Sequence, residues 1–320
     1  MTILVTGAAG FVGLNVVEHL LRAGRTVVGL DRIDLPARAR RDFAALPGSL
    51  IWIGGSVRSA SDLSRAMTMA PVDVVIHCAV ITSGSAREAA DPEGIVDVNV
   101  SGAVATLAAA ARRGVRRFIY PSSVAVYGAS ARGGQSVSED LPAQPLMLYG
   151  LTKLACETLL PRIADVQGIG FAAARLASVY GPWEYATGAR DTLSPMLSAL
   201  ELAKAEQEAV LSQPGVGDFV YSRDVAAGLV ALADAPALDR ALYNLGSGQA
   251  RSAEDYCTAL ARIVPGFRWR RAAEGEQANV VSHVAFDRGP LAIGRIAADT
   301  GWGPQWPMKE AAADYLAWTD

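Results

Sequence analysis

The sequence predicts an α/β protein with a doubly wound parallel sheet and a smaller, irregular lobe towards the C-terminus. Three observations predict this fold. Short apolar runs alternate with amphipathic or alanine-rich runs from Thr2 to Ala174, as strands and helices alternate in such sheets. The run Val72–Ala79 is too apolar to have a solvent-facing side, which is typical of parallel strands covered by helices on both faces. After Gly181 the alternation loosens and prolines punctuate shorter elements.

The composition is that of a globular, enzyme-sized protein. The 320 residues are 51% hydrophobic, so the chain can bury a large core. It has 29 basic and 32 acidic residues without long runs of one sign, and we expect neither a nucleic-acid nor a membrane partner. We also expect no signal peptide and no membrane-spanning run. Three scattered cysteines, Cys78, Cys156 and Cys257, suit a reducing, cytoplasmic setting.

The first unit of the chain predicts a dinucleotide site. A strand over Thr2–Thr6 is followed by Gly7, Gly10 and Gly13, a helix, and a second strand over Thr26–Asp31. Gly7 would let the chain turn off the strand, and Gly10 would let backbone amides approach a pyrophosphate at the helix N-terminus. Gly13 would let the helix pack closely on the sheet. Such glycines also occur in ordinary turns, and only the strand before and the helix after favour a nucleotide.

The acid at the end of the second strand indicates which dinucleotide binds. Asp31 lies where a carboxylate can accept hydrogen bonds from the adenosine ribose hydroxyls, and it would repel a 2′-phosphate. The sequence therefore favours NAD. Arg32 would instead attract the 2′-phosphate, which leaves NADP as an open alternative.

The elements that follow continue the alternation of strand and helix. We expect a helix that opens at Asp91, with a capping side chain and a proline in its first turn, and that ends near Gly114. Pro161 should bend or end the helix in which it lies. The other expected elements are strands at Leu50–Gly54, Val72–Ala79 and Arg117–Tyr120 and a helix at Ser59–Ala70.

Two domains are expected, a dinucleotide-binding domain over residues 1–175 and a substrate-binding lobe over residues 176–320. Asp218–Tyr221, with the helix from about Asp224, resembles another strand and helix unit. We expect residues 217–236 to rejoin the main sheet, which would make the division discontinuous.

Polar groups suited to catalysis follow the later strands. Ser122 and Ser123 come after the strand that ends at Tyr120, and Tyr149 and Lys153 are four residues apart at the start of a helix, hence on one face. A lysine ammonium close to a tyrosine favours the phenolate, which can take a proton from a substrate hydroxyl. The pattern predicts hydride transfer coupled to proton transfer at a carbinol carbon. Pairs with this spacing are common on solvated helices, so the glycine turn is needed to make the signal specific.

Together these motifs resemble an extended short-chain dehydrogenase/reductase of the NAD-dependent epimerase/dehydratase family, which includes UDP-galactose 4-epimerase and has a Rossmann fold. The resemblance covers most of the chain. It rests on Gly7–Gly13, Asp31, His77–Ala79, Asp97–Gly102, Ser122–Gly128, Tyr149–Lys153, Arg175–Pro182 and Tyr243–Gly248.

The resemblance implies roles for individual residues. It implies that Ser123, Tyr149 and Lys153 are catalytic and that a homodimer forms through the alanine-rich helix and the Tyr149 helix. It further implies a set of cofactor-binding residues, in addition to the glycines, Asp31 and Arg32: Phe11 and Val12 at the pyrophosphate, Ser56 and Val57 at the adenine, Ala79, Val80 and Ile81 at the nicotinamide, and Asn99, Ser122, Tyr149 and Lys153.

Departures from the family pattern bear on the reaction. Members that eliminate water carry an acidic pair where this chain has Val124–Ala125, which disfavours a dehydratase. Nucleotide-sugar enzymes have Asn in place of Ser178 and an Arg-Asp-Phe run in place of Gly217–Phe219, so the case for a nucleotide sugar is weaker. Nearby arginines could substitute, although each could equally form a surface salt bridge. The candidate substrate residues are Ser83, Ser123, Tyr149, Ser178, Arg190 and Arg223.

The predicted function is NAD-dependent hydride transfer at a secondary alcohol of a sugar nucleotide or sugar derivative, as in an epimerase. Net oxidation of a free sugar or sugar acid is the alternative. A non-catalytic dinucleotide-binding protein is a more remote one, because such proteins often lack the tyrosine or the lysine. The sequence has no metal-ligand spacing, and we expect no metal.

Overall fold

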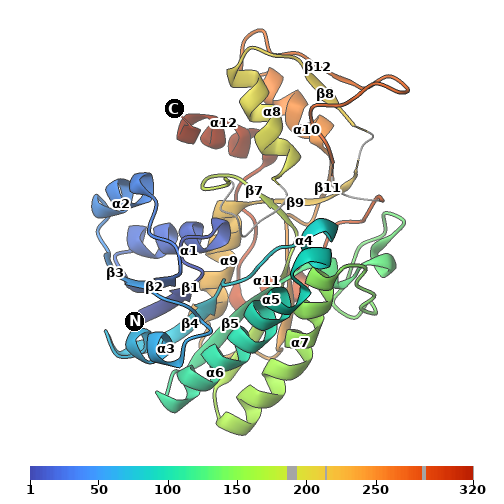
Figure 1. The fold of residues 1–320 in the computed structure, drawn as a ribbon. Coiled ribbons are helices and arrows are strands. Elements are labelled where there is room, and N and C mark those ends of the chain that lie inside the picture. The colour runs from blue at the N-terminus through green and yellow to red at the C-terminus, as the bar shows by residue number, and fades with distance from the viewer. Residues whose placement is uncertain (186–192, 213–214, 283–285, 320) are drawn as a thin grey trace.

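The computed structural model describes residues 1–185, 193–212, 215–282 and 286–319. Its main body is a seven-stranded sheet in the order β10-β6-β5-β4-β1-β2-β3, and every neighbouring pair is parallel (Figure 1). This confirms the predicted doubly wound sheet. The strands are β1 Thr2–Thr6, β2 Thr26–Asp31, β3 Ser49–Gly54, β4 Val72–His77, β5 Arg117–Ser123, β6 Gly170–Leu176 and β10 Leu242–Leu245.

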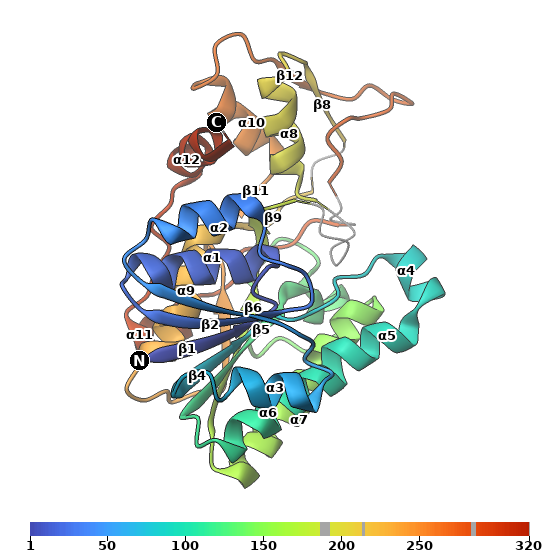
Figure 2. The ribbon, with the colours of Figure 1, turned by 60° about the vertical axis from the view of Figure 1, so that its left-hand side comes forward.

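Helices cover both faces of the sheet (Figure 2). One face packs against α1 (Phe11–Arg22), α2 (Ala37–Ala44) and α9 (Ser222–Asp234), and the other against α3 (Ala60–Ala66), α6 (Gly102–Arg112) and α7 (Leu148–Gln167). Each face has its own core of fully buried aliphatic side chains, such as Leu14 on one and Leu107 on the other. Burying one such side chain contributes about 1.5–3 kcal/mol, which explains why the strands are apolar on both faces.

The element that contains the two serines differs from the expectation. Strand β5 continues to Ser123 because Ser122 and Ser123 pair with Arg175 and Leu176 of β6. Both serines therefore lie at the end of a strand and not in a following loop. Conversely, Val72–Ala79 forms a strand only to His77, and the helix expected from Ser59 to Ala70 ends at Ala66.

The alanine-rich helix opens as predicted but changes type along its length. The Asp91 side chain accepts a hydrogen bond from the Gly94 amide (2.9 Å), and α5 (Pro92–Val96) leads through a π-helical turn at Asp97–Ser101 into α6. Contrary to our expectation, the run Pro92–Arg112 is long and apolar enough to cross a membrane by length and composition. However, 44% of its most apolar window is buried inside the protein, and core helices pass the same test.

Helix α7 does not end at its proline. It runs from Leu148 to Gln167 with Pro161 inside it, so of the two expected effects of Pro161, a bend or an end, the end does not occur. Proline removes only one hydrogen-bond donor from the helix, and the buried side chains Leu160 and Ala164 hold the final turns against the sheet. The helix ends at Gly168, which adopts the left-handed conformation with φ of 68°.

The C-terminal lobe stands above the carboxyl ends of the strands (Figure 1). Its core is separate from the two sheet cores and is built around Tyr180, Leu200 and Tyr256. Its described elements are β7 Ser178–Tyr180, α8 Pro195–Lys204, β8 Ala209–Leu211, β9 Gly217–Tyr221, β11 Ala250–Arg251, α10 Ala253–Ala261, β12 Trp269–Arg271 and α12 Met308–Thr319. Among the remaining short helices, α4 Ser85–Ala90 follows β4, α11 Gly294–Thr300 lies against β10, and the 3₁₀ helices Val124–Val126 and Ala129–Ala131 follow β5.

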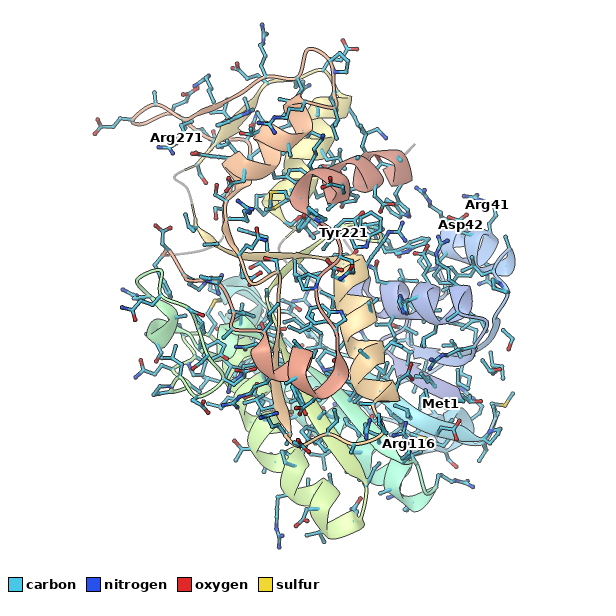
Figure 3. The ribbon with its side chains drawn as sticks, turned by 180° about the vertical axis from the view of Figure 1, so that it is seen from behind. Met1, Arg41, Asp42, Arg116, Tyr221 and Arg271 are labelled. Atoms are coloured by element: carbon cyan, nitrogen blue, oxygen red, sulfur yellow. The ribbon has the colours of Figure 1, made fainter. Side chains whose placement is uncertain are left out.

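The unit at residues 217–236 rejoins the main body only in part. Strand β9 lies between β11 and β7 in a three-stranded sheet, whereas the helix that follows it, α9, packs against α1. The strand that completes the main sheet is β10. Tyr221 marks the junction of the lobes (Figure 3), where its hydroxyl donates to Asp314 of α12 (2.5 Å).

Candidate active site

The structure has a cleft of about 470 Å³ at the carboxyl ends of the central strands. It lies where the strand order reverses between β1 and β4, the place at which ligands bind in open α/β sheets. Most of the predicted site residues line it. These are Gly7, Gly10, Phe11, Val12, Gly13, Asp31, Arg32, Ser56, Val57, Ala79, Val80, Ile81, Ser122, Ser123, Tyr149, Lys153 and Ser178.

The glycine turn is fixed by close backbone contacts. Gly7 has φ of +64°, and a Cβ there would lie 2.5 Å from the Ala79 amide nitrogen. A Cβ on Gly13 would lie 2.0 Å from the Gly7 carbonyl oxygen. Helix α1 begins directly after Gly10, which has no side chain to cap the first amides, and the first turn lines the cleft. Uncapped amides at a helix N-terminus are suited to a pyrophosphate.

Asp31 is held at the end of β2 by backbone amides. Its Oδ2 accepts from the Ala9 amide (2.9 Å) and its Oδ1 from the Ile33 amide (3.2 Å). Burial raises the pKa of Asp31, and these amide hydrogen bonds oppose that shift. The carboxylate is thus oriented towards the cleft beside Arg32, where it can accept from ribose hydroxyls.

Asn99 lies behind the cleft wall and does not line it. The Asn99 side chain accepts from the Ile81 amide (2.8 Å) and donates to the Ile81 carbonyl (3.0 Å) and to Thr152 (3.1 Å). It therefore ties the segment Ala79–Ile81 to helix α7. Asn99 lies in the π-helical turn, and its implied contact with the cofactor stays a prediction.

Three candidate catalytic groups converge on the cleft from β5 and α7. Ser123 ends β5, and its Oγ accepts from the Ala125 amide (3.1 Å). Tyr149 lies in the first turn of α7, with Lys153 one turn later. The buried Lys153 ammonium donates to the Pro121 carbonyl (2.6 Å) and lies 5.8 Å from the centre of the Tyr149 ring. The arrangement places a cation beside a phenol at the cleft surface, as proton transfer from a hydroxyl requires.

The cleft is also lined by residues that the sequence did not indicate as part of the site. Phe219 of β9, Ser282 and Arg288 line it together with Ser178. Arg288 is partly buried, and burial lowers the pKa of its guanidinium. No acidic side chain among the described residues forms an ion pair with it. Gly289 packs closely against the Gln135 carbonyl, and this contact fixes the segment. No spacing in the sequence predicts the contact.

Two of the predicted substrate residues that the structure describes do not line the cleft. Ser83 is buried and donates to Glu88 (3.4 Å). Arg223 pairs with Asp314 (2.7 Å) and approaches Glu18 (3.6 Å), so it forms a salt bridge, as in its alternative interpretation. Arg190 lies outside the described residues. Among the residues that the structure describes, no group of three His, Cys, Asp or Glu side chains could hold a metal ion.

Comparison with known proteins gives a consistent picture. A family model described as the NAD dependent epimerase/dehydratase family matches residues 3–246. The UDP-glucose 4-epimerase of Mycolicibacterium smegmatis is 29% identical over 319 residues, covering 98% of this chain and 96% of that protein. The solved UDP-glucose 4-epimerase of Thermus thermophilus in complex with NAD is 25% identical, with a TM-score of 0.78 over 99% of this chain and 98% of that one.

A further solved structure supports the fold alone. The UDP-glucose 4-epimerase of Thermotoga maritima with UDP-glucose has a TM-score of 0.81 and 21% identity, covering 100% of this chain and 98% of that chain. The C-terminal lobe is thus part of the shared architecture.

The buried histidine beside the cleft makes stability dependent on pH. Burial lowers the pKa of His77 from 6.5 to about 3, so the folded protein keeps it neutral where the unfolded chain takes up a proton. The free energy of unfolding should therefore fall as the pH falls from 6.5 towards 3, by up to about 1.4 kcal/mol per unit from this group. In His77→Asn that contribution disappears. Urea unfolding of both proteins between pH 6 and pH 4 measures the difference, and equal slopes would contradict the assignment.

Proposed function

The chain belongs to the NAD-dependent epimerase/dehydratase family, and from this premise we propose that its cleft transfers a hydride at a secondary alcohol of a carbohydrate. NAD is the cofactor. The observation that carries the proposal is that the glycine turn and Asp31 share one cleft with Ser123, Tyr149 and Lys153. A single site therefore combines a dinucleotide cradle with groups able to move a proton.

The residues divide the binding of NAD among them. The first amides of α1 would hold the pyrophosphate, and Asp31 would accept the adenosine ribose hydroxyls. Ser56 and Val57 would flank the adenine, and Ala79–Ile81 would lie along the nicotinamide. When bound there, NAD supplies the hydride acceptor for the reaction.

The chain's own groups move the proton. The Tyr149 phenolate takes the proton from the substrate hydroxyl, and the Lys153 ammonium stabilises that phenolate because it lies close by in a buried position. Ser123 hydrogen-bonds the same substrate oxygen and holds it in line with Tyr149. Return of the proton, together with return of the hydride to the opposite face of the oxidised carbon, would complete an epimerisation, whereas release of the oxidised product would make the enzyme a dehydrogenase.

The substrate is proposed to be an anionic carbohydrate. Arg288 brings a guanidinium without an acidic partner among the described residues to the cleft that also holds the catalytic groups. A sugar nucleotide would place its diphosphate there, as the nucleotide-sugar substrates named for the related epimerases suggest. A sugar acid would place a carboxylate there instead. Val124 and Ala125 follow the proposed catalytic serine, where an enzyme that eliminates water would carry an acidic pair. A dehydratase is therefore disfavoured.

The reaction is tested by incubating the enzyme and NAD with panels of sugar nucleotides and sugar acids. Net appearance of NADH would identify a dehydrogenase, and an isomerised product without NADH would identify an epimerase. If no member of either panel reacts, the proposed substrate class is wrong.

Removal of the Tyr149 hydroxyl should abolish most of the activity. Tyr149→Phe should lower kcat by about 10²–10⁴-fold, because it removes the group that takes the proton, while the Kd for NAD stays nearly unchanged. Steady-state kinetics and NAD titration measure the two effects. Tyr256→Phe is a suitable control, because this buried hydroxyl lies in the core of the C-terminal lobe. Retained turnover in Tyr149→Phe would refute the role assigned to Tyr149.

Arg288 should contribute to substrate affinity and not to the chemical step. Arg288→Met should raise KM for an anionic substrate by about 10–100-fold with little change in kcat, because a charge-assisted hydrogen bond is lost. Arg132→Met provides the control, since Arg132 is exposed and stacks on Phe286 beside this segment. An unchanged KM for every anionic substrate would show that Arg288 does not bind the charged group.

We also propose a homodimer formed through the outer faces of α6 and α7. Helix α7 exposes three apolar side chains, Leu151 (50%), Leu159 (44%) and Val166 (67%), at spacings that put them on one side of the helix. Leu151→Glu with Leu159→Glu should convert the dimer to monomer in analytical ultracentrifugation. Leu146→Glu, exposed just before α7, should leave the dimer intact. A wild-type chain that sediments as a monomer would contradict the proposal.

A further inference from the structure

A buried ion pair that the proposed chemistry does not use lies directly beneath the catalytic groups. It joins Glu157 of α7 to Arg175 of β6, and the two side chains are only 6% and 5% exposed. Arg175 donates from Nη2 to Oε2 (2.6 Å) and from Nε to Oε1 (3.0 Å), so the guanidinium grips both carboxylate oxygens. Such fork-to-fork pairing fixes geometry as well as charge.

The pair is tied to both elements that carry catalytic side chains. Glu157 follows Lys153 by one helical turn and Tyr149 by two, so the three residues share one side of α7. Its Oε1 also accepts from the Ser122 hydroxyl (2.5 Å), and Ser122 is the neighbour of Ser123. Glu157 thereby connects the helix of Tyr149 to the end of the strand of Ser123.

Arg175 is itself fixed from three sides. It is the register partner of Ser122 across β5 and β6. Its guanidinium stacks on the Tyr127 ring (4.4 Å), and its Nη1 donates to the Glu139 carbonyl (3.4 Å). The Tyr127 hydroxyl in turn donates to Asn244 of β10 (2.6 Å). The ion pair between Glu157 and Arg175 is therefore held in place by contacts that reach three neighbouring strands, β5, β6 and β10.

We propose that Glu157 and Arg175 are positioning residues, which set the distance between the Ser123 hydroxyl and the Tyr149 phenol. This inference rests on the proposed function of Ser123 and Tyr149. Ser123 lies at the end of β5 and Tyr149 in the first turn of α7, so a small slide of the helix along the sheet would change the distance between the two groups. A misplacement of about 1 Å can lower the rate about 10²-fold.

The test separates positioning from stability by comparing single and double variants. A lone buried charge destabilises the fold, whereas replacing both partners with apolar residues often does not. Arg175→Met should lower both Tm and kcat. Glu157→Leu combined with Arg175→Met should recover Tm but keep kcat at least about tenfold below wild type, with KM and the Kd for NAD within about twofold. Arg175→Lys, which keeps the charge, should have an intermediate kcat.

A matched control comes from another bidentate pair. Arg25 donates to Asp234 through both terminal nitrogens (2.6 Å each). Both residues are far in sequence from Ser123, Tyr149 and Lys153. Arg25→Met should leave kcat unchanged. A double variant of the Glu157–Arg175 pair that recovers kcat together with Tm would overturn the proposal, because the pair would then serve stability alone.

A readout independent of activity keeps the two proposals distinguishable. If wild-type enzyme turns over no panel substrate, the proposed function fails, and the positioning role is decided by crystal structures of wild type and of the double variant. A change of about 1 Å in the distance from Ser123 Oγ to the Tyr149 hydroxyl supports the inference. An unchanged distance overturns it.

Discussion

The structure depends on a backbone contact that only glycine permits. The Gly7 carbonyl lies where a Cβ on Gly13 would be, and Gly7 itself presses against the Ala79 amide. Through this contact the end of β1, the first turn of α1 and the segment after β4 meet at one point. The strand order reverses at the same point. The glycine turn proposed to bind the pyrophosphate therefore contacts the segment Ala79–Ile81 proposed to line the nicotinamide. A single methyl group at either glycine would force the backbone apart.

The cofactor half of the site could be predicted because its signals are local. The glycine spacing, the acid at the end of β2 and the four-residue spacing of Tyr149 and Lys153 each lie within one strand, turn or helix, so their relative positions follow from element geometry. The apolar pattern likewise gave the strands of the main sheet and its class. What it missed was the strand β5 reaching Ser123, which pairing with β6 decides, and the helix continuing past Pro161, which packing decides.

The substrate half could not be predicted because it is assembled over long distances in the chain. Asp218 of β9 accepts hydrogen bonds from the neighbours Ser247 and Gly248 and from Leu291, and so joins two distant segments to β9. Arg288 lines the cleft from a segment that packs at Gly289 on the loop at Gln135, far away in the sequence. Arg288 has no periodicity or motif that would mark it, and the run around Asp218 does not reveal which segments that side chain joins. The apolar strands β9 and β10 also look alike in sequence, and only the pairing shows that β10 joins the main sheet.

The ion pair of Glu157 in α7 affects the charge of Lys153, which lies one turn earlier in the same helix. On an isolated helix, Lys153 and Glu157 at four-residue spacing would pair with each other and cancel much of the charge on the lysine. Here Glu157 is committed to Arg175 and Ser122, and no ion pair among the described residues includes Lys153. The lysine contacts instead a carbonyl and the Tyr120 ring, near a His77 that stays neutral because burial depresses its pKa. The pairing of Glu157 with Arg175 therefore preserves a positive charge beside Tyr149, where the proposed proton transfer needs it.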